Sequence, residues 1–306
     1  MISSRFRCGI AALVGRPNVG KSSLINAILK TKAAIVSPKP QTTRNETRFI
    51  YNEERPLAPP SQIIFADTPG IHIPKNKLGR FLIDSVQNAL AAADLVCYLV
   101  EASDREVGAE DKEAISTLAD FKKNIILTAT KCDKGEPEMA FDTYRPRLGK
   151  VSACVAISSK NGRGLFDFID SCLPFLPIGE PRFDASILMD GTERFMAAEL
   201  VRSAALDLLR DEVPHCVAVE IDEYKSPDEY PDRKKLYIRA SLLVETGGQK
   251  AIIIGSGGAM LKKIGVRSRK YLEDATGHET YLELWVKVSP HWRESAAVLR
   301  RLGYKV

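Results

Sequence analysis

The chain has 306 residues, of which 44% are hydrophobic and 7% aromatic, and its formal net charge is +5. At roughly 150 residues per domain, this length predicts about two domains, with enough apolar material for packed cores. No apolar run approaches the roughly 20 residues of a membrane-spanning helix, which excludes an integral membrane protein. So mild a positive charge does not by itself identify a partner.

The N-terminus and the cysteines both indicate a reducing compartment. The first residues run straight into a strand-like segment and lack the small-residue cleavage site of a secretory signal. The six cysteines show no Cys-x-x-Cys spacing, and several stand inside apolar runs. We therefore expect reduced thiols and a cytoplasmic protein.

The first part of the chain alternates apolar strands with helices. Strands are predicted over residues 9–14, 62–66, 95–100, 124–129 and 155–158. Helices are predicted over residues 22–30, 78–92, 111–120, 138–149 and 164–173. This order predicts an α/β fold with a mostly parallel sheet that is covered by helices on both faces.

The second part has a different pattern. A proline and glycine cluster at residues 174–181 places the domain boundary between residues 178 and 179. Beyond it we expect helix, strand, strand, helix, helix and strand, which together form a small α+β unit. Their residues are 193–210, 217–221, 236–244, 251–254, 259–275 and 281–288, and 292–302 forms a closing helix.

A phosphate-binding loop follows the first strand. The motif Gly-x4-Gly-Lys-Ser/Thr is complete and lies between a predicted strand and a predicted helix. Its backbone amides can surround phosphates, Lys21 can bridge the β- and γ-phosphates, and the Ser22 hydroxyl can ligate Mg²⁺. The expected nucleotide contacts here are Gly15, Arg16, Pro17, Asn18, Val19, Gly20, Lys21, Ser22 and Ser23.

Two further segments are expected near the γ-phosphate. After the strand at 62–66, Asp67 can hold Mg²⁺ through water and the Gly70 amide can bond the γ-phosphate. This motif contributes Asp67, Thr68, Pro69, Gly70 and Ile71. Between the first helix and the next strand, we favour Thr43 over Thr42 as a ligand of Mg²⁺ and the γ-phosphate. We thus assign catalysis to Lys21, Thr43 and Gly70, and the metal to Ser22, Thr43 and Asp67.

The choice of base rests on two later strand ends. The Asp133 carboxylate can accept the N1–H and 2-amino hydrogens of guanine, which adenine does not offer. The stem of Lys131 can cover the base, and the next strand end can add backbone contacts. Four ordered motifs therefore predict a guanine nucleotide. The expected contacts are Thr130, Lys131, Cys132, Asp133, Ser158, Ser159 and Lys160.

These motifs together resemble the bacterial Era family of GTPases. The resemblance lies in GRPNVGKSSLINAIL, PKPQTTRNETR, DTPGIH, TKCD and ISSKNGRG, and in the second part in ERFMAAELVR, VAVEI, IIIGSGGAMLKKIG and LELWVKVSPHWRESAAVLRRLGY. It covers nearly the whole chain. It implies a P-loop GTPase domain over residues 1–178, followed by an RNA-binding domain over 179–306 whose type II KH core lies at about 210–290.

The resemblance also implies a role. Such a protein hydrolyses GTP slowly, binds the 3′ end of small-subunit (16S) ribosomal RNA and assists assembly and maturation of the small ribosomal subunit. Contact with the cytoplasmic face of the inner membrane belongs to the same family expectation, and we expect a monomer. Asn18 resembles an asparagine with which related GTPases ligate potassium, so K⁺ joins GTP, GDP and Mg²⁺ among the expected cofactors.

This sequence departs from the family pattern at three positions. Thr130 stands where the family usually has asparagine, and Ser159 where it has alanine, which weakens the expected grip on guanine. Gly257 stands where a lysine is common, so one phosphate contact with RNA is missing. Ile71 matches the family, and because an isoleucine cannot orient water, it implies slow hydrolysis.

The RNA-binding residues are expected around the turn Gly255-Ser-Gly-Gly258. A Gly-x-x-Gly loop lets two helices meet closely and lets a nucleic-acid backbone approach. No acidic residue lies between Thr246 and Leu272, whereas several basic ones do. We expect bases beside Ile252 and Ile254 and phosphates on the helix that follows. The full set is Ile252, Ile254, Gly255, Ser256, Gly257, Gly258, Lys262, Lys263, Arg267, Arg269 and Lys270.

Two other functions remain open from the sequence. The chain could be a P-loop kinase or ATPase, although the Thr130–Asp133 and Asp67–Gly70 motifs argue against it. It could instead be a GTP-regulated switch that docks on protein or membrane and whose KH-like domain no longer binds RNA; Gly257 is the feature that favours this. We expect Trp285 and Trp292 in the core rather than stacked on bases.

Overall fold

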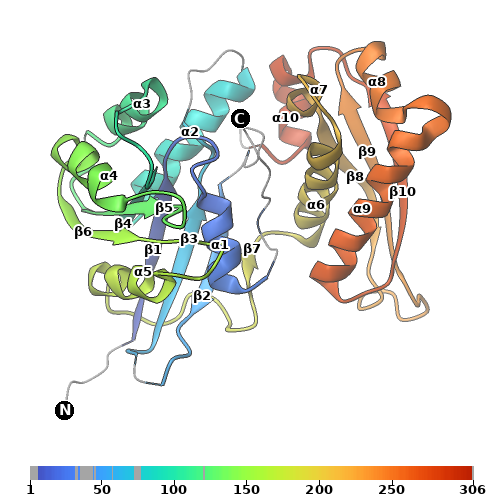
Figure 1. The fold of residues 1–306 in the computed structure, drawn as a ribbon. Coiled ribbons are helices and arrows are strands. Elements are labelled where there is room, and N and C mark those ends of the chain that lie inside the picture. Colours follow the sequence, from blue (N-terminus) through green and yellow to red (C-terminus); the bar gives the residue numbers. More distant parts are fainter. Residues whose placement is uncertain are drawn as a thin grey trace. The chain divides into compact units, whose positions relative to one another are not determined.

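The computed structural model describes residues 6–31, 34, 44, 46–56, 58–71, 77–119 and 121–304. They form two compact units (Figure 1). The first ends at Asp190, and the second comprises the residues from Gly191 onward together with residues 77–81. Thr43, expected at the metal and the γ-phosphate, lies outside the described residues, as does Thr42. Within the described ranges, no helix combines the length and the apolar character that a membrane crossing requires.

The first unit is built on a seven-stranded sheet in the order β6-β5-β4-β1-β3-β2-β7. The five strands from β6 to β3 run parallel, whereas β2 is antiparallel to β3 and β7 is antiparallel to β2. The mostly parallel sheet predicted from the sequence is confirmed. The strands are β1 Arg7–Val14, β2 Thr47–Asn52, β3 Ser61–Asp67, β4 Leu95–Glu101, β5 Asn124–Thr130, β6 Val151–Ala156 and β7 Met189–Asp190.

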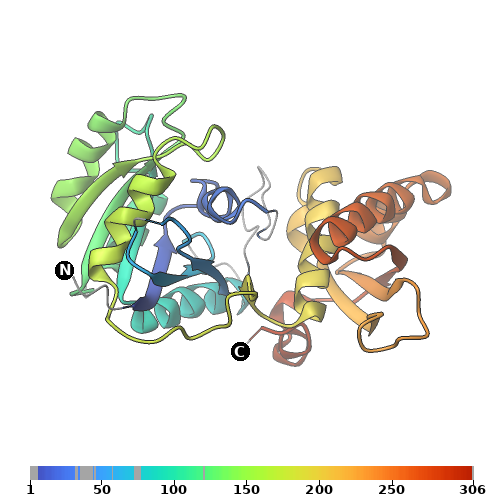
Figure 2. The same cartoon turned by 90° about the horizontal axis from the view of Figure 1, so that it is seen from below.

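Helices cover both faces of this sheet (Figure 2). One face carries a core with α2, α3 and α4, and the other a core with α1 and α5. Because both faces are covered, the central strands β1, β3, β4 and β5 are buried along nearly their whole length. The helices are α1 Lys21–Leu29, α2 Lys77–Ala92, α3 Ala109–Thr117, α4 Pro137–Tyr144 and α5 Leu165–Cys172, and short 3-10 turns occur at Arg145–Arg147 and Leu173–Phe175.

Three strands of the first unit differ most from the prediction. β6 spans Val151–Ala156 instead of 155–158, because the exposed Ser152 interrupts its apolar residues and most of the strand is only half-buried. β2 and β7 were not predicted at all. β2 forms by antiparallel pairing with β3, a long-range contact that its own residues do not reveal. β7 has only two residues, too few to produce a periodic pattern.

The first unit extends past the boundary expected at residue 178, as far as Asp190. Hydrogen bonds along this extension hold it to the first unit. The fully buried Gln62 side chain accepts hydrogen bonds from the backbone N–H groups of Arg182 and Phe183, at 2.9 and 3.1 Å. Further on, Met189 pairs with Phe49 as β7 joins the edge of the sheet. The prolines of this stretch mark a connection that stays attached to the first unit.

The second unit packs helices on one face of a three-stranded sheet in the order β10-β9-β8, in which β10 is parallel to β9 and β8 is antiparallel. The predicted order of helix, strand, strand, helix, helix and strand is confirmed, except that a short unpredicted helix of four residues precedes the first strand. The elements are α6 Glu193–Leu208, α7 Val213–Cys216, β8 Ala218–Lys225, β9 Leu236–Val244, α8 Gly247–Ile254, α9 Ala259–Thr276, β10 Thr280–Val288, a 3-10 turn at Trp292–Glu294 and α10 Ala296–Arg301.

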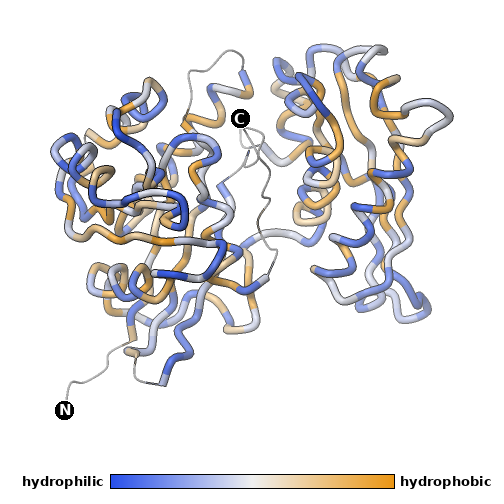
Figure 3. Tube along the Cα trace, viewed as in Figure 1, coloured by the Kyte–Doolittle hydropathy of each residue, from blue (hydrophilic) through white to orange (hydrophobic). Residues whose placement is uncertain are grey.

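The core of this unit lies between α6, α8, α9 and the inner face of the sheet. Hydrophobic residues follow the strands of both units in Figure 3. Trp292 is fully buried, and its indole N–H donates to the Cys216 carbonyl at 2.9 Å, as expected for a core residue. The same expectation is wrong for Trp285, which is 58% exposed because odd-numbered residues of β10 face away from the helices.

Candidate nucleotide and RNA sites

The phosphate loop takes its shape from backbone conformations that few residues tolerate. It joins β1 to α1, and the φ angles of Asn18 and Gly20 are 62° and 116°. A Cβ atom at Gly15 would lie 2.6 Å from the Leu99 carbonyl oxygen, so only glycine fits there. Gly20 caps α1 without a side chain, which leaves the start of the helix accessible to an anion.

Lys21 places a positive charge inside this loop. Its Nζ donates to the carbonyl oxygens of Gly15 and Arg16, at 2.9 and 3.0 Å. Burial lowers the pKa of Lys21 to about 8, although the carboxylate of Asp67 opposes this shift. The ammonium therefore sits desolvated where the predicted phosphates would lie, which strengthens its interaction with an anion.

Ser22 and Asp67, the two described residues expected at the metal, lie side by side. The Ser22 hydroxyl donates to the Asp67 carboxylate at 2.8 Å, and both side chains are buried. They meet because β1 and β3 are parallel neighbours, in which Leu13 pairs with Asp67. A hydroxyl and a carboxylate oxygen are hard ligands that suit Mg²⁺, so these residues fit the predicted ion.

The Asp67–Gly70 turn packs directly on the phosphate loop. A Cβ atom at Gly70 would lie 2.8 Å from the backbone N and Cα of Pro17, so any side chain there would displace one loop or the other. The Thr68 hydroxyl donates to the Leu13 carbonyl at 2.7 Å and fixes the start of the turn. Ile71 is buried in the core, where its apolar side chain has no means of orienting water.

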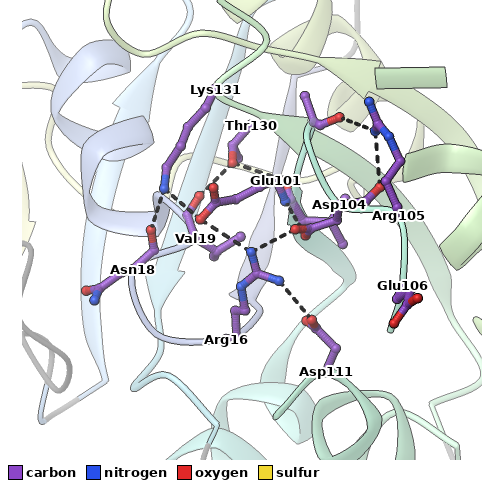
Figure 4. Close-up of polar contacts among 12 residues, drawn as sticks. Arg16, Asn18, Val19, Glu101, Asp104, Arg105, Glu106, Asp111, Thr130 and Lys131 are labelled. Carbon is purple, nitrogen blue, oxygen red and sulfur yellow. Dashed lines mark hydrogen bonds and ion pairs between the residues drawn. The ribbon is translucent and has the colours of Figure 1, made fainter. Parts of the chain in front are cut away.

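The Thr130–Asp133 segment, here called the base-reading motif, forms hydrogen bonds with the phosphate loop. The Thr130 hydroxyl lies 2.6 Å from the Val19 carbonyl oxygen and 3.0 Å from that of Val100. A hydroxyl has one hydrogen, so it donates to one of these carbonyls at a time. Lys131 has a φ angle of 55°, and its Nζ donates to the Asn18 carbonyl at 3.1 Å. Figure 4 shows these contacts between the two motifs.

Asp133 is exposed and is held by the following strand end. The buried Ser158 hydroxyl donates to its carboxylate at 2.7 Å, and this hydrogen bond keeps the pKa of Asp133 below its usual value. Lys160 adds a smaller electrostatic effect in the same direction. The carboxylate is thus ionised and oriented, as a guanine-reading group requires.

The side chains of the remaining predicted residues of the nucleotide site differ in their exposure to solvent. The side chains of Val19 and Cys132 belong to the hydrophobic cores, so these residues can offer a nucleotide only their backbone. Cys132 donates its backbone N–H to the Ile157 carbonyl at 3.1 Å, which ties the third motif to the fourth. Pro69 is also buried, whereas the half-buried or exposed side chains belong to Arg16, Pro17, Asn18, Ser23, Lys131, Ser159 and Lys160.

Sequence reasoning missed the acidic residues behind the phosphate loop. The Arg16 guanidinium lies 2.9 Å from Asp104, 3.1 Å from Asp111 and 3.3 Å from Glu101. Figure 4 shows Arg16 pointing into this group. No spacing in the sequence signals it, because the acids stand at the end of β4, in the loop after it and on α3.

In the second unit, a glycine-rich turn joins α8 to α9. Gly255, Gly257 and Gly258 have φ angles of 71°, 57° and 80°, in the left-handed region that favours glycine. A Cβ atom at Gly255 would lie 2.8 Å from the Met260 side chain, whereas Gly257 faces open space. The two helices therefore meet closely, and the turn leaves room for an approaching backbone.

A groove of about 350 Å³ with both apolar and basic lining residues runs between α9 and β10. Leu282 and Leu284 of β10, which the sequence analysis did not select, line it together with Lys262 and Arg269. Neither Ile252 nor Ile254 lines this groove, and their role beside RNA bases stays a prediction. Ile252 is 52% exposed on α8, and Ile254 packs on the core. The alternation of β10, which turns even-numbered residues inward, was the available signal.

A second and larger groove, of about 800 Å³, lies between α6 and α9. The basic residues of α9 are therefore divided between two surfaces. Arg269 faces the groove beside β10, Lys262 lines both grooves, and three cations line the α6 side with an apolar floor. The floor consists of Leu208, Ala259, Val266 and Tyr271, and the three cations are Lys263, Arg267 and Lys270.

Comparison with known proteins agrees with both units. A family model described as a 50S ribosome-binding GTPase matches residues 10–131, and a KH domain model matches residues 212–293. The GTPase Era of Carboxydothermus hydrogenoformans is 40% identical over 302 residues, 98% of each chain. That of Leuconostoc citreum is 41% identical, over 99% of this chain and 98% of the relative.

Two solved structures are similar over nearly the full length. One is Era in complex with MgGDPNP and nucleotides 1506–1542 of 16S ribosomal RNA, with a TM-score of 0.88 and 37% identity over 98% of this chain and 100% of that one. The other is a variant of Aquifex aeolicus Era bound to GDP and AlF4⁻, with a TM-score of 0.87, 36% identity and the same coverage. The expected resemblance is confirmed, and the chain belongs to the Era family of GTPases.

Proposed function

We propose that this chain binds GTP with Mg²⁺, hydrolyses it to GDP and phosphate, and binds the 3′ end of 16S ribosomal RNA to assist assembly and maturation of the small ribosomal subunit. The observation that carries this proposal is the juxtaposition of four ordered motifs at one edge of the sheet. The contacts Ser22–Asp67, Thr130–Val19 and Ser158–Asp133 link these motifs in pairs.

In this proposal each motif has a separate task. Lys21 and the backbone of the phosphate loop neutralise charge on the β- and γ-phosphates. Ser22, Asp67 and Thr43 would hold Mg²⁺, which when bound shields the phosphate charge. The Gly70 N–H binds the γ-phosphate, and Asp133 reads guanine. Because Ile71 is buried and apolar, no side chain at that position orients the attacking water, so intrinsic turnover is slow.

RNA is assigned to the second unit. The glycine turn admits the RNA backbone, the groove between α9 and β10 receives unstacked bases, and the exposed cations of α9 bind phosphates. The bound RNA in the similar Era structure supports this assignment. Gly257 supplies no charge, so the salt dependence of RNA binding is shallower than with a lysine there.

A nucleotide-dependent change in RNA affinity is the proposed use of the two domains on one chain. GTP would order the loops around Thr43 and Gly70, and hydrolysis would release them. The protein would then work in the cytoplasm, where small subunits assemble. Stimulation by K⁺ through Asn18 is part of the same proposal, and equal turnover in sodium and potassium buffers would remove it.

Phosphate release by the purified chain, with GTP and Mg²⁺ and with ATP as competitor, tests the enzymatic part. We expect hydrolysis of GTP that excess ATP does not suppress and that Lys21→Ala abolishes. Suppression by ATP would indicate a P-loop ATPase or kinase instead. Binding of a labelled 16S 3′-end RNA, with GDP or with a GTP analogue, tests the rest. No binding in either state would favour a protein- or membrane-docking switch.

A further inference from the structure

Glu101, the last residue of β4, joins cations from two different nucleotide-site motifs. Its Oε1 lies 2.7 Å from Lys131 Nζ and 3.3 Å from the Arg16 guanidinium. Figure 4 shows its carboxylate between the two cationic groups. The Glu101 side chain is only 23% exposed, so water screens these ion pairs less than it would at the surface.

Lys131 needs such an anchor. Its φ angle of 55° lies in the left-handed region, where residues other than glycine are uncommon and pay a conformational cost. Asn18, whose carbonyl accepts from Lys131 Nζ at 3.1 Å, is also left-handed, with a φ angle of 62°. Two residues with left-handed backbones are therefore joined by the hydrogen bond from the Lys131 ammonium to the Asn18 carbonyl. The same ammonium forms the ion pair with Glu101.

Arg16 does not depend on Glu101 in the same way. It has shorter contacts to Asp104 and to the fully buried Asp111, at 2.9 and 3.1 Å. Asp111 is fixed in turn by hydrogen bonds from the Tyr98 and Tyr144 hydroxyls, at 3.2 and 2.8 Å. Lys131, by contrast, has Glu101 as its one ion-pair partner among the residues described. Loss of Glu101 should therefore affect Lys131 more than Arg16.

The threonine at position 130 increases the importance of this anchor. Its single hydroxyl hydrogen serves either the Val19 or the Val100 carbonyl, whereas an asparagine amide would offer two donors. When the Thr130 hydroxyl donates to the Val100 carbonyl, it no longer donates to Val19 in the phosphate loop. The hydrogen bond from Lys131 to the Asn18 carbonyl then connects the base-reading motif to that loop. That contact is the one that Glu101 orients.

We propose that Glu101 is a positioning residue for guanine recognition. It holds the Lys131 ammonium against the Asn18 carbonyl, so that the aliphatic stem of Lys131 forms a fixed wall over the base. Glu101 itself touches neither base nor phosphate. This inference rests on the guanine-nucleotide binding proposed above and adds a determinant that lies outside the four motifs.

The test is the dissociation rate of a fluorescent GDP from the full-length Glu101→Gln protein, which loses the charge but keeps the shape. We expect dissociation about tenfold faster than in the wild type, equivalent to about 1.4 kcal/mol. In steady-state hydrolysis, KM for GTP should rise while kcat stays the same, because Glu101 acts on the base and not on the phosphates.

Two matched variants separate positioning from a general structural effect. Asp104→Asn alters an acid that also contacts Arg16 but does not contact Lys131. Asp104 also accepts from the Glu101 backbone N–H at 2.9 Å, and the oxygen of the asparagine amide can keep this hydrogen bond, so the variant should leave GDP dissociation within about twofold of the wild type. In a Lys131→Met background, Glu101→Gln should add nothing further. If Glu101→Gln does not fold, Glu101→Asp, which keeps the charge on a shorter side chain, should still accelerate dissociation.

Each outcome distinguishes this inference from the proposed function. A wild-type protein that does not bind GDP would overturn both. Unchanged dissociation in the Glu101 variants would overturn the positioning role alone. Equal effects of Glu101→Gln and Asp104→Asn, or full additivity with Lys131→Met, would assign Glu101 to the support of Arg16 instead and would also overturn it.

Discussion

The Ser158 hydroxyl donates a 2.7 Å hydrogen bond to the Asp133 carboxylate. The two residues follow β5 and β6, which are parallel neighbours in the sheet, so the register of two strands sets the orientation of the carboxylate. A bidentate acceptor has to point both oxygens at the base edge, and a fixed carboxylate loses less freedom when it binds. Ser158, from the fourth motif, therefore orients the Asp133 carboxylate of the third.

Substitution of Ser158 should weaken guanine binding without changing the choice of base. In Ser158→Ala, Asp133 keeps its charge but loses its anchor, and we expect GDP affinity to fall about fivefold to tenfold. The preference for GDP over ADP should persist, whereas Asp133→Asn should remove it. Calorimetric titration with both nucleotides measures this. Ser152→Ala, at an exposed position of β6 where the hydroxyl donates to the Asn124 side chain, is the control and should bind like the wild type.

Gly70 should tolerate no side chain. The Cβ of Gly70→Ala would lie 2.8 Å from the Pro17 backbone, so the phosphate loop and the turn must separate. We predict that GTP hydrolysis falls at least about tenfold, since the Gly70 N–H leaves the γ-phosphate. Gly149→Ala is the matched control, because a Cβ there meets nothing within 4 Å. Equal activity of the two variants would contradict this account of the contact.

Nucleotide affinity should decrease at alkaline pH. Burial lowers the pKa of Lys21 to about 8, and a bound phosphate raises it again. Affinity should therefore be full below pH 8 and fall above it, by up to about tenfold per pH unit, as binding takes up a proton. Calorimetry at pH 9 in buffers of different ionisation enthalpy should show this uptake. No uptake at pH 9 would mean that Lys21 stays protonated before binding.

Arg269 should contribute a phosphate contact to RNA binding. Removal of one such contact lowers the slope of log affinity against log salt by about 0.7 for single-stranded RNA. We predict this change for Arg269→Ala, measured by fluorescence anisotropy with a 16S 3′-end RNA. Arg239 lies on β9 and is paired with Glu223, so Arg239→Ala should leave the slope unchanged. The reverse ranking would place RNA on the other face of the sheet.

The arrangement of the candidate nucleotide site could be predicted from the sequence because its motifs combine fixed spacing with fixed positions at strand ends. Lys21, Asp67, Gly70 and Asp133 all lie where those positions placed them. The carboxylates that support the loop could not be found this way. Glu101, Asp104 and Asp111 meet Arg16 only through the packing of β4 and α3, and no spacing records that packing.

The RNA surface shows the same limit. The glycine turn and the cations of α9 were visible in the sequence, whereas the two leucines of β10 that line the groove beside α9 were not selected. A helix shows several faces, and the face that meets β10 depends on how α9 lies across the sheet. Only the structure places Leu282 and Leu284 in the groove and divides the cations between its two sides.

The measurement that tests the central claim most directly is in-cell RNA crosslinking and sequencing, comparing the wild type, Gly257→Asp and Gly277→Asp. Both glycines have positive φ angles of 57° and 72° and face open space, so both variants carry similar strain and charge. We predict reads at the 3′ end of 16S ribosomal RNA for the wild type and Gly277→Asp, and their loss in Gly257→Asp. No enrichment at that end in any of the three proteins would contradict the proposed role in the small subunit.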